Sequence, residues 1–154
     1  EVAALVGHPE RGERLIAEIE AARERARATV TGPRPTAAVY QRRGYVSGGD
    51  TLTAELLGIV GFGDGAAALA GGRGGFVPLE AMIAEPPDYI VVSSLDRAAE
   101  DQGSALLSHP ALAAAFPPER RIVFPERYTV CGGPSLPAAL DYLSTEAARA
   151  KAGS

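Results

Sequence analysis

The feature that most constrains the fold is a short apolar run, residues 36–40, which leads through a polar loop into an amphipathic helix. The run is rich in strand formers and follows a proline, as is typical of a buried strand. Asp50 or Thr51 can cap the helix, and Gly61 can end it. In open α/β sheets, ligands bind at the loops that follow the carboxyl ends of the strands. We therefore expect loop 41–50 to form part of a binding surface.

Two further apolar runs, residues 89–93 and 121–124, also read as strands, and a short fourth strand is expected between residues 62 and 77. Segments with helical spacing separate these runs. Alternation of strands and helices predicts an α/β fold, a three-layer α/β/α sandwich around a small parallel, Rossmann-like sheet. Helices are expected at residues 8–29, 51–61, 78–84, 104–107, 110–115 and 135–150.

The composition excludes several classes of protein. A length of 154 residues suits one domain with its own core, and 46% hydrophobic with 22% charged residues indicates a globular chain. The net charge of -4 gives no indication of nucleic-acid binding. A single cysteine excludes an internal disulfide. The sequence starts at Glu1 without a methionine or a signal peptide, and we interpret it as a piece of a longer protein.

Established catalytic and metal-binding motifs are absent from the sequence. His8 and His109 have no partner at a metal-ligand spacing, and the glycines at 71–75 lack the lysine of a phosphate-binding loop. Cys131 could act as a nucleophile only with an adjacent base, and Asp96 could act as one of a pair of carboxylates. These two residues leave open the alternative of a small α/β hydrolase or transferase.

Three loops are expected to meet at the carboxyl edge of the sheet: 41–50, 94–102 and 125–133. They carry arginines and tyrosines, which suit a large anionic or conjugated ligand through charge-assisted hydrogen bonds and cation–π contacts. The alternative is that the arginines are simply solvated. The candidate ligand-binding residues are Gln41, Arg42, Arg43, Tyr45, Asp96, Arg127, Tyr128 and Thr129.

The order of the motifs resembles one family over nearly the whole chain. The motifs are Pro-Thr-Ala-Ala-Val-Tyr, then Gly-Tyr-Val-Ser-Gly-Gly-Asp-Thr-Leu, then Phe-Val-Pro-Leu-Glu-Ala-Met-Ile-Ala-Glu-Pro-Pro-Asp-Tyr-Ile-Val-Val, and finally Cys-Gly-Gly-Pro-Ser-Leu. They are similar to the carboxy-terminal lobe of the substrate-binding proteins of ABC importers for iron-siderophores, haem and cobalamin. That resemblance implies that residues 1–7 end an interlobe helix, that residues 8–154 form the carboxy-terminal lobe, and that an amino-terminal lobe is missing.

The resemblance also implies a function. Such a protein captures a metal chelate between its two lobes and delivers it to the permease. It is not an enzyme, has no resident cofactor or metal site, and works in the periplasm or on a lipid anchor, with its signal peptide outside this sequence. Glu80, in Pro-Leu-Glu-Ala-Met, matches the family glutamate that docks onto permease arginines. From the residues alone, Glu80 is an acid in the first turn of a helix, where the helix dipole favours it.

The identity of the chelate does not carry over from the family, because Gln-Arg-Arg at 41–43 is not a general signature.

A third reading is a stand-alone interaction domain of flavodoxin type. That reading would need an acidic cluster after the first strand, where this chain has Arg42 and Arg43.

Overall fold

The computed structural model describes residues 2–93, 105–130 and 132–152. Its centre is a sheet of four parallel strands in the order β3-β1-β5-β6. Ala37 pairs with Tyr89, and Ile90 pairs with Arg121, so the three predicted strands are parallel as expected. The expected short fourth strand is β3, which pairs with β1 at one edge of the sheet. The strands are β1 (Thr36–Val39), β3 (Gly63–Asp64), β5 (Tyr89–Val92) and β6 (Arg121–Val123).

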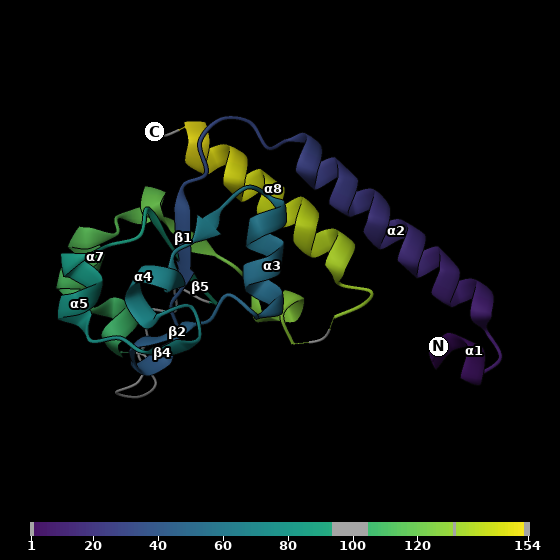
Figure 1. The fold of residues 1–154 in the computed structure, drawn as a ribbon, viewed down its shortest axis with the longest axis horizontal. Helices are drawn as coiled ribbons and strands as arrows, with labels where there is room; N and C mark the ends of the chain where they lie inside the picture. Colours follow the sequence, from purple (N-terminus) through teal and green to yellow (C-terminus); the bar gives the residue numbers. More distant parts are fainter. Residues whose placement is uncertain (1, 94–104, 131, 153–154) are drawn as a thin grey trace.

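Helices cover both faces of the sheet, which gives the predicted three layers (Figure 1). Successive strand residues point to opposite faces. Accordingly, Ala37 and Val91 belong to one buried cluster, while Ala38 and Ile90 belong to the other. The first cluster packs against α2 (Pro9–Ala28), α3 (Leu52–Ile59) and α8 (Leu136–Ala152); the second packs against α4 (Ala66–Ala70), α5 (Leu79–Ala84) and α7 (Pro110–Ala115).

The long helix α2 packs on α8 through its carboxyl-terminal part. Ala22 and Ala26 are fully buried there, and Arg25 donates to both carboxylate oxygens of Asp141 at 3.1 and 3.2 Å. The amino-terminal half of α2 projects beyond the sheet, and α1 (Val2–Leu5) turns back against it (Figure 1). The helical spacing of Leu15, Ile16, Ile19, Ala22 and Ala26 predicts one buried stripe, but Ile16 is 57% exposed. The buried stripe is therefore confined to the part of α2 that faces α8.

A two-stranded antiparallel ribbon, β2 (Tyr45–Ser47) with β4 (Gly74–Phe76), follows the end of β1. The glycine-rich composition of residues 71–75 is typical of a flexible surface connection, but residues 74–76 form the strand β4. Gly74 has φ +82°, and a Cβ there would lie 2.7 Å from the backbone nitrogen of Gly48. Only glycine fits this conformation and this close approach.

Several helix boundaries follow from local chemistry. The Thr51 hydroxyl caps α3 by accepting from the Ala54 N–H at 3.3 Å. Proline favours the first helical position, which predicts Pro78 there, but Pro78 is the N-cap residue of α5. The apolar spacing predicts that Leu79, Met82 and Ile83 point inward, but Ile83 is 38% exposed. No helix in the described residues is long and apolar enough to span a membrane. The short 3-10 helices are η1 (Arg42–Gly44), η2 (Leu106–Ser108), η3 (Pro118–Arg120) and η4 (Glu126–Tyr128).

Candidate functional site

The candidate site lies at the carboxyl edge of the sheet. Because β1, β5 and β6 are parallel, the described loops that follow β1 and β6 lie at this edge, as the sequence predicted, while loop 94–102 after β5 lies outside the described residues. η1 and the β2–β4 ribbon follow β1, and η4 follows β6; both lie along the lower side of Figure 1. Asp96 and Cys131 fall outside the described residues.

The turn η1 places two arginines at this edge under backbone strain. Arg43 has φ 60° and ψ 17°, a left-handed conformation that is costly for a residue with a side chain. Gly44, which follows, also has positive φ, and a Cβ there would lie 2.8 Å from the carbonyl oxygen of Val77. The side chains of Arg42 and Arg43 are exposed. Strained residues often occur at functional sites, so we take this turn as a candidate ligand contact.

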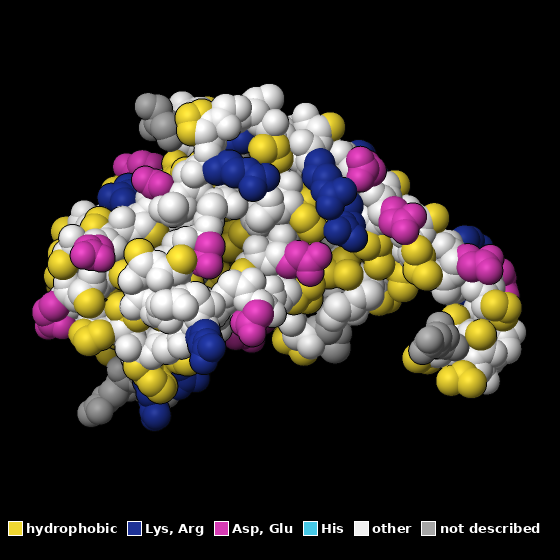
Figure 2. All heavy atoms as spheres, in the orientation of Figure 1, with side chains coloured by type: hydrophobic (Ala, Val, Ile, Leu, Met, Phe, Trp, Pro, Cys, Tyr) yellow, Lys and Arg dark blue, Asp and Glu magenta, His cyan; other side chains and the backbone are white. Residues whose placement is uncertain are grey.

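An aromatic pair, of which Phe76 is exposed and Tyr45 is half-buried, lies beside the arginines. Tyr45 and Phe76 face each other across the β2–β4 ribbon, with ring centroids 5.4 Å apart and planes at 74°. Phe76 is 72% exposed. Figure 2 shows Lys and Arg side chains gathered around apolar ones over this ribbon, at the lower left of the molecule. Sequence reasoning missed Phe76, although an isolated phenylalanine in a glycine-rich stretch was an available signal.

Gln41 stabilises the loop rather than presenting a free amide. Its Nε2 donates to the Ser47 hydroxyl at 2.6 Å, and its backbone N–H donates to the Tyr45 carbonyl at 2.8 Å. Ser47 is only 7% exposed. These two bonds close the loop between β1 and β2 and fix where the neighbouring arginines emerge.

The loop after β6 combines a packed tyrosine with a covering arginine. The Tyr128 ring stacks on Phe124 at 5.6 Å and 21°, and the Arg127 guanidinium lies 4.6 Å from the centre of the Tyr128 ring. Arg127 also donates to the Tyr128 hydroxyl at 3.2 Å, and the Thr129 hydroxyl donates to the Glu126 carbonyl at 3.1 Å. Tyr128 is therefore half-buried, and Arg127 is the more exposed of the two.

Glu80 lies near the same edge, on the exposed side of α5. The Val77 N–H donates to the Gly44 carbonyl at 2.8 Å, which ties the start of α5 to the η1 turn. Beneath them, the buried Tyr40 hydroxyl has no hydrogen-bond partner among the described residues. Burial, followed by the negative charge of Glu80, raises the pKa of Tyr40 above its usual value. The negative charge of Glu80 therefore acts on the Tyr40 hydroxyl at the end of β1.

The described residues at this edge supply cations and aromatic rings rather than metal ligands. No group of three or more His, Cys, Asp or Glu side chains that could hold a metal ion occurs in the described part of the chain. Guanidinium groups bind carboxylates through charge-assisted hydrogen bonds, and exposed rings bind conjugated surfaces. The arrangement therefore suits the binding of an anionic, conjugated molecule.

A parallel α/β unit with such an edge belongs to the class of solute-binding modules. The chain is a member of the periplasmic binding protein family, whose model matches residues 1–117. A search of curated protein sequences found no match.

Solved structures of binding proteins share the fold. The periplasmic heme-binding protein RhuT from Roseiflexus sp. RS-1 is 27% identical with a TM-score of 0.72, covering 99% of this chain and 60% of that one. HutB, a periplasmic heme-binding protein of Vibrio cholerae, is 20% identical with a TM-score of 0.72, covering 94% and 59%. FeuA from Bacillus subtilis, a triscatecholate siderophore binding protein, is 18% identical with a TM-score of 0.67, covering 97% and 56%. This chain thus spans about 60% of the length of RhuT.

Proposed function

We propose that this chain is the carboxy-terminal lobe of the solute-binding component of an ABC importer, and that it captures a metal chelate against a second lobe. The observation that carries the proposal is the exposed ring of Phe76, paired with the half-buried Tyr45, beside Arg42 and Arg43 at the carboxyl edge. In this reading, residues 8–154 form the lobe and residues 1–7 end the interlobe helix. The chelate is transported cargo, and the protein needs no resident cofactor.

Among metal chelates, haem fits this edge best. The exposed face of Phe76 offers a surface for a flat conjugated ring, and the arginines can bind carboxylates at its rim. The 27% identical Roseiflexus protein is heme-binding, which favours the same ligand class. Iron-siderophores and cobalamin are the other members of the class.

The partners follow from the same reading. Glu80, exposed on α5, docks onto an arginine of the ABC permease, and the protein acts in the periplasm or on a lipid anchor outside the cytoplasmic membrane. The enzyme alternative rests on Asp96 and Cys131, which lie outside the described residues, whereas the family to which the chain belongs is one of binding proteins. We therefore propose a binding protein without catalytic activity.

A titration of the full-length protein with ferric haem, followed by the change in its absorption spectrum, tests the proposal. Phe76→Ala should weaken haem binding at least about tenfold, because burying a phenyl ring contributes about 1.5–3 kcal/mol. Ile83→Ala, which removes another exposed apolar side chain away from the ribbon, is the matched control and should leave affinity unchanged. Unchanged haem affinity in Phe76→Ala would contradict the proposed surface. Tight binding of a ferric siderophore without haem binding would keep the importer role and reject haem.

A further inference from the structure

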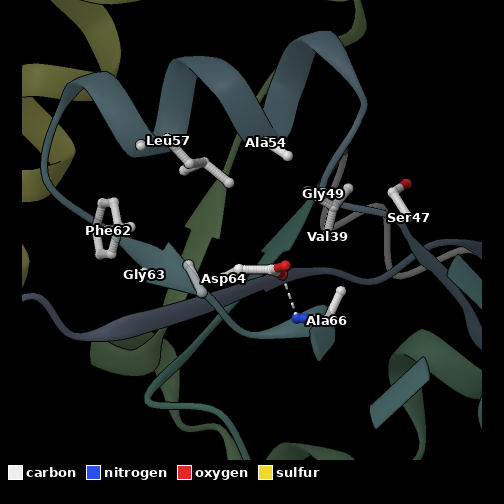
Figure 3. Close-up of a pocket in the computed structure, with 11 residues that line it drawn as sticks. Val39, Ser47, Gly49, Ala54, Leu57, Phe62, Gly63, Asp64 and Ala66 are labelled. Carbon is white, nitrogen blue, oxygen red and sulfur yellow. Dashed lines mark hydrogen bonds between the residues drawn. The ribbon is translucent and has the colours of Figure 1, made fainter. Parts of the chain in front are cut away.

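A pocket of about 140 Å³ lies between α3, the β1–β3 edge of the sheet and the first residue of α4 (Figure 3). Val39, Leu57 and Phe62 supply its larger apolar walls. Ser47 and Asp64 are its polar side chains. The aromatic ring of Phe76 and the side chains of η1 are not among its lining residues, but the pocket borders the β2–β4 ribbon through Ser47.

The pocket exists because the surrounding side chains are small. Six of its eleven lining residues are glycine or alanine. Gly58 is the clearest case: it lies inside α3, where glycine is about 1 kcal/mol less favourable than alanine, yet a Cβ there would meet nothing within 4 Å. Packing against the described residues therefore does not require glycine at this position. A cavity of about 150 Å³ is known to accommodate a benzene-sized molecule, so one small ring fits the space.

The polar groups of the pocket are oriented by hydrogen bonds. Asp64 Oδ1 accepts from the Ala66 N–H at 2.8 Å, and Figure 3 shows the Asp64 carboxylate extending into the space beneath α3. Its second oxygen accepts no hydrogen bond from another described residue. The Ser47 hydroxyl, 7% exposed, accepts from Gln41 at 2.6 Å and so can donate its own proton into the pocket.

We propose that this pocket binds a small organic cation, an ammonium group carried on an apolar body of about one ring. The ammonium would donate to the open oxygen of Asp64, and the ring would lie against Val39, Leu57 and Phe62. Asp64 is exposed to solvent, yet its carboxylate beside the pocket still favours a cation over a neutral molecule of the same shape, because a charged hydrogen bond is gained together with the burial of the ring. The proposal does not depend on the identity of the chelate.

Titration of the full-length protein with benzylammonium, monitored by amide chemical shifts, tests the proposal, with benzyl alcohol as the neutral comparison. We expect saturable shifts, in the millimolar range, confined to residues 37–39, 47–49, 54–58 and 62–66. Benzyl alcohol should bind at least tenfold more weakly. Asp64→Asn, which can keep the hydrogen bond from Ala66, should lower benzylammonium affinity to the level of benzyl alcohol.

Gly58→Leu gives the second arm of the test. Because a Cβ at this position meets no atom within 4 Å, the leucine should fill the pocket without lowering the melting temperature, and it should abolish both sets of shifts. Three results would overturn the proposal: no saturable shift at tens of millimolar, equal affinity for the amine and the alcohol, or unchanged amine binding in Asp64→Asn. If Gly58→Leu were destabilised, the Asp64→Asn comparison alone would decide.

Discussion

Replacing Arg43 with asparagine should make the protein more stable and worse at binding its ligand. Arg43 is the one non-glycine residue with positive φ in the described part of the chain, at φ 60°. Asparagine tolerates this left-handed conformation better than other side chains do. The substitution therefore relieves backbone strain and removes the cation at the same position.

The two effects can be given magnitudes. The left-handed conformation costs a residue with a side chain about 1–2 kcal/mol, so Arg43→Asn should recover about 1 kcal/mol of unfolding free energy. In a protein of this size, that corresponds to a rise of about 2–4 °C in melting temperature. Losing one charged hydrogen bond to a ligand carboxylate should cost about 1.4 kcal/mol, which is about tenfold in affinity.

Urea unfolding followed by circular dichroism and a haem titration on the same samples would measure both quantities. Arg34→Asn is the matched control, because Arg34 is exposed before β1, at the opposite end of that strand, and does not have positive φ. It should change neither stability nor affinity. A stability gain without a loss of haem affinity would refute Arg43 as a ligand contact. No gain in stability would show that the backbone of η1 is not strained.

Three further predictions concern other parts of the same lobe. Glu80→Arg should abolish uptake in cells while leaving haem affinity and melting temperature nearly unchanged; normal uptake by this variant would exclude docking through Glu80. Gly65→Ala should lower the unfolding free energy by about 1–3 kcal/mol in urea, because its Cβ would lie 2.7 Å from the Ala37 carbonyl carbon and the backbone of β1 cannot easily move. Tyr40→Phe should be equally or more stable at neutral pH, because the buried hydroxyl has no partner among the described residues. The pKa of Tyr40 is raised in the folded state, so the folded protein keeps the hydroxyl proton at a pH above 10.0, where the unfolded chain loses it. The free energy of unfolding of the native protein therefore decreases as the pH rises above this value. The free energy of unfolding of Tyr40→Phe should decrease less steeply above pH 10, and an equal slope would contradict this prediction.

The layers and the sheet could be predicted because their signals are local. Each strand of the predicted set is a continuous apolar run between turn residues, as in Tyr89–Val92, which is buried throughout. Alternating strands and helices then leave few topologies to consider. The meeting of loops 41–50 and 125–133 at one edge followed from parallel strands alone. The roles of Gln41, Arg42, Tyr45, Arg127 and Thr129 in binding remain predictions.

The rest could not be predicted because it depends on contacts between distant residues or on missing side chains. The β4 strand has no strand-like periodicity, and it forms because Gly74 allows the chain to pass close beside β2. Phe76 becomes a candidate ligand contact only because β4 pairs with β2 and brings its ring against Tyr45. The pocket beneath α3 is a space left by glycine and alanine, and a sequence pattern gives no signal for an empty volume.

We propose that the chelate lies on the β2–β4 ribbon at the carboxyl edge. Paramagnetic broadening of amide signals in the full-length protein loaded with ferric haem tests this placement. Gallium protoporphyrin, which has no unpaired electrons, is the control for shifts caused by binding alone. Our account predicts that the signals of Tyr45, Phe76 and their neighbours broaden most, with weaker effects at η4, while those of Thr36 and Arg121 at the opposite edge stay sharp. If bound haem broadened the signals at the opposite edge and left those of the ribbon sharp, the chelate would not lie on the ribbon.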